Sequence, residues 1–239
     1  MKKYLAAIAL VTVTLVVVSQ SVAAEKPRLG VLRFTNDTRA SWWSGTAGRD
    51  LQDMLSAELV SLGSFQVLER KELEAVLSEQ DLGASGRVDP KTAAKIGKLK
   101  GARYLVAGTV SAFEEGTSGK GMGVSVFGVS VGGKKERAYM AVDLKVIDTT
   151  TGEIVDARTV EATSESTSQR LGISAPFVST GMEKEQKTPT GKAIRACIIE
   201  IAEYLECSMV KGKDDECMNE YKEKEGKRRE KTKKSIKLE

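Results

Sequence analysis

The chain has 239 residues and a formal net charge of +4, and it contains no histidine. Without histidine the usual general base, the Ser-His-Asp arrangement and the commonest metal ligand are all missing, which excludes most hydrolase and zinc-enzyme chemistry. Hydrophobic residues make up 41% of the chain and charged residues 29%, so we expect a folded protein whose mature part has no ordinary transmembrane helix.

The first 24 residues have the three parts of a secretory signal peptide. Met1-Lys-Lys provides a positive start, residues 5–18 are almost entirely apolar, and Ser21-Val-Ala-Ala24 places small residues where signal peptidase cuts. The apolar run of about 14 residues is shorter than the roughly 20 that a spanning helix needs, although a retained N-terminal anchor is an alternative. The first cysteine is Cys197, so we expect an exported protein that is not a lipoprotein.

Residues 25–210 are predicted to form one domain, which begins by alternating strands with helices. Asp89-Pro90 supplies an N-cap and a first-turn proline for a helix that Gly101 follows. The expected elements of this first part are a strand at 28–34, a helix at 46–62, a strand at 65–68, a helix at 69–82 and a helix at 91–99.

The middle of the chain is dominated by extended segments. Strands are predicted at 102–113 and 138–147, and the turn Asp148-Thr-Thr-Thr-Gly-Glu153 leads into another extended run. Two segments, about 114–138 and 164–187, are candidate β-hairpin extensions. In an exported protein, such hairpins are candidate pieces of an outer-membrane β-barrel.

The first hairpin carries the clearer membrane pattern. Apolar residues alternate on one parity and then on the other, which indicates a bulge or a tip near Phe127-Gly128. In the second hairpin the apolar residues are confined to the centre, at 171–178. The candidate membrane-facing residues of the first hairpin are Met122, Val124, Val126, Phe127, Val129 and Val131.

The last helix is predicted to start at Thr188-Pro189 and to bury an apolar stripe that includes Cys197. Cys207 and Cys217 are ten residues apart, which is no metal-site spacing, and in an oxidising compartment they either pair in a disulfide or stay free. Residues 211–239 form a charged tail, disordered or helical, whose basic end either touches an anionic surface or only solubilises the chain.

An ordered set of segments resembles the CsgG/HfaB family of curli secretion and holdfast-anchoring proteins. Order and spacing match from about Leu29 to Leu205. The segments that carry the resemblance are Leu29-Gly-Val-Leu-Arg-Phe-Thr-Asn-Asp-Thr38, Val67-Leu-Glu-Arg-Lys-Glu-Leu73, Gly101-Ala-Arg-Tyr-Leu-Val-Ala-Gly-Thr-Val110, the glycine-rich stretch around Phe127-Gly128, and Val142-Asp-Leu-Lys-Val-Ile-Asp-Thr-Thr-Thr-Gly-Glu-Ile154.

The resemblance implies an α/β periplasmic domain with a mixed sheet, flanking helices and two hairpins. In the family these hairpins join those of neighbouring subunits in a homo-oligomeric ring that closes an outer-membrane channel for unfolded secreted proteins. The family's pore is narrowed by a loop after the first strand, and here that loop contains Trp42 and Trp43. These tryptophans either form the constriction or pack on the domain.

Two functions follow from these observations. The first is a subunit of a ring-shaped secretion channel of the curli type at the outer membrane. The second is a soluble periplasmic adaptor that uses the same domain and extensions to bind envelope proteins. No nucleophile–base pair can be named, so an enzyme is not expected, and neither is a cofactor, a metal or a nucleic-acid partner.

Overall fold

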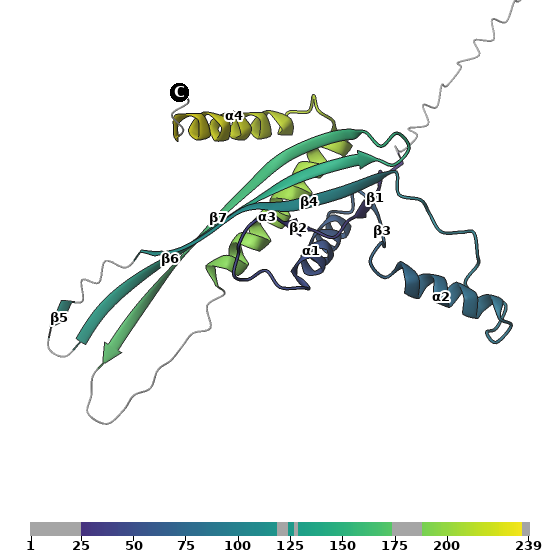
Figure 1. Ribbon diagram of the computed structural model, residues 1–239, viewed down its shortest axis with the longest axis horizontal. Helices are drawn as coiled ribbons and strands as arrows, with labels where there is room; N and C mark the ends of the chain where they lie inside the picture. The colour runs from purple at the N-terminus through teal and green to yellow at the C-terminus, as the bar shows by residue number, and fades with distance from the viewer. Residues whose placement is uncertain (1–24, 119–123, 127–128, 174–187, 236–239) are drawn as a thin grey trace, which may run out of the picture.

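The computed structural model describes residues 25–118, 124–126, 129–173 and 188–235. Within these residues, seven strands form one mixed sheet, and helices α1 (Ala47–Leu62) and α3 (Pro189–Glu206) lie side by side on one of its faces (Figure 1). The predicted α/β fold with a mixed sheet and flanking helices is therefore confirmed. The predicted signal peptide, residues 1–24, lies outside the described residues.

The parallel part of the sheet comes from the alternating strands and helices at the start of the domain. Strand β1 (Arg28–Val31) lies between β3 (Gln66–Leu68) and β4 (Tyr104–Ser118), parallel to both. The two-residue strand β2 (Thr35–Asn36) also pairs with β4 in parallel. Leu29 and Val31 lie on one face of β1 and are both buried, and Gly30, on the opposite face, is buried as well.

The antiparallel part consists of long strands that continue beyond the body. Strand β6 (Val129–Asp148) pairs with β4 along one edge and with β7 (Ile154–Ile173) along the other. The short strand β5 (Val124–Val126) pairs with β6 along the same edge as β4. Its register pairs Val126 with Val129. The predicted bulge or tip near Phe127-Gly128 falls on residues outside the described ranges.

The hairpin between β6 and β7 is closed by Asp148. Its carboxylate accepts hydrogen bonds from the backbone N–H of Thr150 at 2.7 Å and from Arg103 Nη2, also at 2.7 Å. These donors stabilise the ionised form and lower the pKa of Asp148. Gly152 has a φ of 76°, which glycine adopts without a Cβ clash.

The core lies between the sheet and the two helices. Leu51, Leu55 and Leu59 recur on one face of α1 and are buried, and Ile201 and Leu205 do the same on α3. Burying a side chain of this size stabilises the fold by about 1.5–3 kcal/mol relative to leaving it exposed. Helix α3 starts at the predicted cap, where the Thr188 hydroxyl accepts from the backbone N–H of Gly191 at 3.2 Å.

The predicted helix at 91–99 is not formed, and this prediction is wrong. Asp89 begins a single turn by accepting from the N–H of Lys91 at 2.9 Å, but Gly97 then adopts a φ of 77°. Ile96 is 62% exposed and Leu99 47% exposed, so no packing surface holds the segment. A helix this short is not stable in water without such packing.

Helix α2 (Leu73–Ala84) forms, although it starts four residues later than predicted. It lies at the end of the molecule opposite the long strands (Figure 1). Leu77 is 45% exposed and Leu82 is 41% exposed, so part of the apolar surface of this helix lies in solvent.

The chain ends in a π-helical turn (Cys207–Lys211) and helix α4 (Cys217–Ser235). Helix α4 lies within the segment that the sequence analysis separated as a charged tail. Met218 and Tyr221 in its first two turns are buried. Among the described residues, no helix combines the length and the apolar character needed to cross a bilayer.

Candidate functional site

We call the arm the part of the sheet that extends beyond the body: residues 116–118 of β4, β5, residues 129–137 of β6 and residues 165–173 of β7. Its strands are continuous with those of the core, because β6 and β7 pair residue by residue from Val146 and Asp156 to Val129 and Ile173. A continuous register makes the arm an outgrowth of the core sheet.

Two register rows at the far end of the arm contain only apolar residues. One row is Val124, Val131 and Leu171, and the other is Val126, Val129 and Ile173. The row between them is Ser125, Ser130 and Gly172. Because directly paired residues share a face and alternate rows share it too, the six apolar residues belong to one face of the sheet.

The sequence analysis found part of this apolar end. It singled out Val124, Val126, Val129 and Val131, and all four lie in these rows. It did not assign Leu171 and Ile173 to the same surface, because the register that aligns β7 with β6 is a tertiary property. Met122 and Phe127, the other two candidates, lie outside the described residues.

Nearer the body the arm becomes polar. Moving two residues at a time from Val131 along β6, the same face continues with Gly133, Lys135 and Arg137. Their partners on β7 are Gln169, Thr167 and Glu165. The apolar face therefore ends about three residues from the strand reversal, a length of roughly 10 Å at the strand rise.

The two tryptophans lie at the base of β4 and not on the arm. Both are partly buried against the core. The ring of Trp42 meets Trp43 edge to face at a centroid distance of 5.4 Å and Phe113 at 5.7 Å. Within the described residues, Trp42 Nε1 is buried without a hydrogen-bond partner. A role for this pair as a pore constriction stays a prediction.

Helix α4 is attached to the sheet by Arg158 of β7. The guanidinium lies 5.0 Å from the ring centroid of Tyr204 on α3 and 5.0 Å from that of Tyr221 on α4. The two rings meet each other edge to face at 5.2 Å. Tyr204 also donates a hydrogen bond of 2.8 Å to Asp156, and burial together with this acceptor raises the pKa of Tyr204. The sequence analysis missed this cluster because its members are far apart in the chain.

A disulfide joins Cys207 to Cys217, with 6.1 Å between their Cα atoms. It connects the end of α3 to the first residue of α4 and therefore limits how far the helix can move. Cys207, Asp215 and Cys217 have ligand atoms within 4.8 Å of one another. With both sulfurs in a disulfide, neither cysteine is available as a thiolate metal ligand. The third cysteine, Cys197, is buried, and burial raises its pKa to about 12.

Between α4 and the base of the arm lies a cleft of about 590 Å³. Acidic and basic side chains both line this cleft. Tyr139 donates a hydrogen bond of 2.8 Å to Glu161, and burial and this carboxylate raise the pKa of Tyr139. On the helix side, Arg228 donates to Glu225 at 2.8 and 2.9 Å. The residues lining the cleft are Glu114, Glu115, Gly116, Arg137, Tyr139, Glu161, Arg228, Lys231, Thr232 and Ser235.

Residues 11–236 match the family described as "Curli production assembly/transport component CsgG". The chain therefore belongs to the CsgG family, as the sequence resemblance predicted, and is a cell-envelope protein.

A relative in Neisseria meningitidis serogroup B, named as a lipoprotein (NMB1126/NMB1164), is 32% identical over 128 residues. The match covers 51% of this chain and 52% of that protein, so the chain spans about half the length of this relative.

Solved structures with a similar fold have TM-scores below 0.5. The hypothetical protein CT253 of Chlamydia trachomatis has 14% identity and a TM-score of 0.42, over 78% of this chain and 99% of that one. The lipoprotein GNA1162 of Neisseria meningitidis has 16% identity and a TM-score of 0.32, over 59% and 84%. The PelC dodecamer of Paraburkholderia phytofirmans has 16% identity and a TM-score of 0.33, over 74% and 87%. We draw nothing about function from similarities of this size.

The prediction that the protein is not a lipoprotein is contradicted by the Neisseria meningitidis relative of 32% identity, whose name is "Putative lipoprotein NMB1126/NMB1164". The prediction was made because Cys197 is the first cysteine of the chain, so no cysteine lies near the expected cleavage site to accept a lipid. A lipid anchor is specified by the leader and its processing, and the folded domain that follows carries no trace of it.

Proposed function

We propose that this protein is a non-enzymatic, membrane-attached subunit of a homo-oligomeric secretion or export assembly in the cell envelope, and that its arm is the part that enters the membrane. The single observation that carries the proposal is the apolar end of the arm, where six apolar residues from three strands occupy two register rows of one face. Attachment to a membrane is also supported by a relative named as a lipoprotein.

The arm has the length of a membrane-crossing strand. Residues 129–137 of β6 span about 30 Å at the strand rise, and a tilted transmembrane strand needs about 9–11 residues. A single arm cannot enter hydrocarbon alone, because the outer edge of β7 carries backbone N–H and C=O groups that would lose their water partners. Arms from several copies that pair edge to edge would satisfy these groups, so the proposal requires a homo-oligomer.

The apolar surface favours a second candidate, an adaptor that binds envelope proteins through the arm. The apolar face of the described strands is roughly 10 Å long, whereas a membrane barrel presents an apolar band of about 25 Å. A short apolar end on a polar stem is also suited to a protein partner, because it would be buried in one contact.

Extraction of the membrane fraction with detergent, followed by size analysis and negative-stain imaging, separates the two candidates. Rings recovered from the outer membrane support the channel subunit. A monomer or small oligomer that is released with the soluble periplasmic fraction contradicts it and leaves the adaptor.

Two aspartate substitutions on neighbouring residues give a matched comparison. Val129→Asp places a charge on the apolar face, and Ser130→Asp places the same charge in the adjacent row. A charge facing lipid costs about 2.5–3.5 kcal/mol near the bilayer centre, so Val129→Asp is expected to abolish assembly in the membrane while Ser130→Asp is tolerated. Equal behaviour of the two variants would show that the apolar face does not meet lipid.

A further inference from the structure

The charges of helix α4 are distributed unevenly along its length. In residues 227–235, six cationic side chains accompany one carboxylate, Glu230, which gives a net charge of +5. In residues 217–226, two lysines accompany three glutamates, which gives −1. Cations near a helix C-terminus stabilise the helix through its dipole, and one or two of them are enough for that effect.

The first half of α4 is packed and ion-paired against the body. Met218 and Tyr221 are buried, and Lys224 Nζ lies 2.9 Å from Glu200 Oε1 of α3. Farther along, the ion pairs are internal to the helix: Arg229 with Glu225 and Lys234 with Glu230, each four residues apart. Across the described part of the chain, no ion pair is recorded for Lys231 or Lys233.

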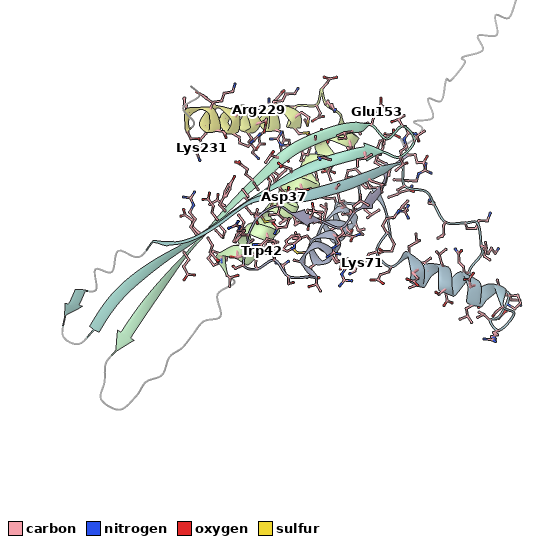
Figure 2. The ribbon with its side chains drawn as sticks, viewed as in Figure 1. Asp37, Trp42, Lys71, Glu153, Arg229 and Lys231 are labelled. Carbon is pink, nitrogen blue, oxygen red and sulfur yellow. A yellow bond between two sulfur atoms is a disulfide. The ribbon has the colours of Figure 1, made fainter. Side chains whose placement is uncertain are left out.

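The basic end of α4 lies beside the base of the arm. Lys231 and Ser235 line the same cleft as Gly116 of β4 and Arg137 of β6, and these are the residues at which the arm leaves the body. Figure 1 shows the C-terminal end of α4 pointing in the same general direction as the arm, and Figure 2 shows Arg229 and Lys231 on the part of the helix that stands off from the strands.

The acidic residues nearby do not neutralise this end. Glu114, Glu115 and Glu161 line the cleft opposite Arg137, Arg228 and Lys231, so the two signs balance inside it. The excess charge is carried by the residues on the outside of the cleft. The side chain of Lys234 is 74% exposed and that of Lys227 is 73% exposed, and each also pairs with the glutamate four residues before it, Glu230 and Glu223.

We propose that the basic end of α4, residues 227–235, is a contact site for the anionic phospholipid headgroups of the membrane that the arm enters. This inference rests on the proposed function, because it takes its membrane from the arm. When the apolar end of the arm lies in hydrocarbon, the base of the arm lies at headgroup level, and the basic end of α4 lies beside it. Clustered lysines and arginines at that level bind an anionic bilayer through their summed charge.

The test measures partition of the full chain between solution and vesicles by co-sedimentation, with phosphatidylcholine vesicles alone and with added phosphatidylglycerol. One variant neutralises Lys231, Lys233 and Lys234 with glutamine. The control neutralises Lys91, Lys95 and Lys98 in the turn segment after α2, which removes the same charge at the opposite end of the molecule.

Partition onto the anionic vesicles is expected to fall about fivefold per lysine removed from α4, on the order of 100-fold for all three. The control should remain close to wild type. Binding to the anionic vesicles should weaken as salt is raised, because screening shortens the range of exposed charges. Equal binding by the two triple variants, or no preference of the wild type for anionic vesicles, overturns the inference.

The vesicle experiment distinguishes a failure of the membrane role proposed for the arm from a failure of the lipid contact proposed for α4. Val129→Asp should lose binding to neutral vesicles and keep the salt-sensitive preference for phosphatidylglycerol, whereas the α4 variant should do the reverse. If soluble polyglutamate binds the wild type and anionic vesicles do not, the basic end recognises an acidic protein, and the lipid assignment is wrong. If inorganic phosphate at low concentration competes with the vesicles, the basic end of α4 binds free phosphate, and the lipid assignment is again wrong.

Discussion

Arg158 of β7 and Tyr221 of α4 are joined twice. The guanidinium carbon lies 5.0 Å from the centroid of the tyrosine ring, and Nη2 donates a hydrogen bond of 2.7 Å to the tyrosine carbonyl oxygen. The pair connects an edge strand of the sheet to a helix that begins 59 residues later, so it is the main side-chain tie between α4 and the strands.

Replacing Arg158 with alanine is expected to release α4. The variant loses the cation–π contacts with two rings and a charged hydrogen bond, so the free energy of unfolding should fall by about 2 kcal/mol. Amide hydrogen exchange in α4 should accelerate more than exchange in α3. Arg229→Ala, which removes a side chain that is 70% exposed, is the control and should change stability by no more than about 0.5 kcal/mol. If amide hydrogen exchange in α4 is unchanged in the Arg158 variant, Arg158 does not hold α4 on the sheet.

Reducing the disulfide between Cys207 and Cys217 is expected to destabilise the folded protein. The loop that it closes has a sequence separation of 10 residues, and a cross-link of this size stabilises by about 2–3 kcal/mol. Thermal unfolding should therefore move to lower temperature when a reductant is added. The double variant Cys207→Ser/Cys217→Ser should start at the lower temperature and be insensitive to reductant. If reductant lowers the unfolding temperature of the double variant by the same amount, the stabilisation does not come from this disulfide.

Gly108→Ala is expected to be severely destabilising. A Cβ at this position of β4 would lie 2.7 Å from Phe34 Cδ1, and Phe34 is a fully buried core residue that cannot move aside easily. We expect a loss of more than about 3 kcal/mol in chemical denaturation, partly recovered when Phe34→Leu is combined with it. Gly116→Ala on the same strand meets nothing within 4 Å and should be nearly neutral.

Glu225 is expected to make α4 sensitive to acid. The guanidinium of Arg228, with a further contribution from Arg229, lowers the pKa of Glu225 from 4.5 to about 2 against the opposing effect of burial. A pKa depressed in the folded state means that the carboxylate stabilises the fold above pH 4.5, and that this stabilisation is lost as the pH falls from about 4.5 to about 2. Glu225→Gln should flatten this part of the stability profile, measured by denaturation at several pH values. An unchanged slope between these pH values would show that the ion pairs do not contribute.

Local patterns predicted most of the body. A strand that starts at Arg28, a helix that ends at Leu62 and the Thr188-Pro189 start of α3 all recur in the structure, because each depends on residues that are neighbours in the chain. The helix expected at 91–99 failed for the complementary reason. Its apolar residues matched the helical period, but Ile96 and Leu99 found no surface to pack against.

The apolar end of the arm was only half visible in the sequence. Val129 and Val131 stand out by alternation, whereas Leu171 and Ile173 follow a polar stretch and join them only through the pairing of β7 with β6. A register shift of one residue would have moved them to the other face. The attachment of α4 was hidden in the same way, because Arg158, Tyr204 and Tyr221 are separated by 46 and 17 residues of chain.

The sequence by itself determined the order of the elements, the family, the absence of histidine chemistry and the charge of the last helix, since these are properties of composition and of near neighbours. Only the tertiary structure decided which strands share an apolar face, where the tryptophans pack and how the basic helix is held beside the arm. Those features depend on contacts between residues distant in the chain, whose alignment is set by the packing of the whole domain.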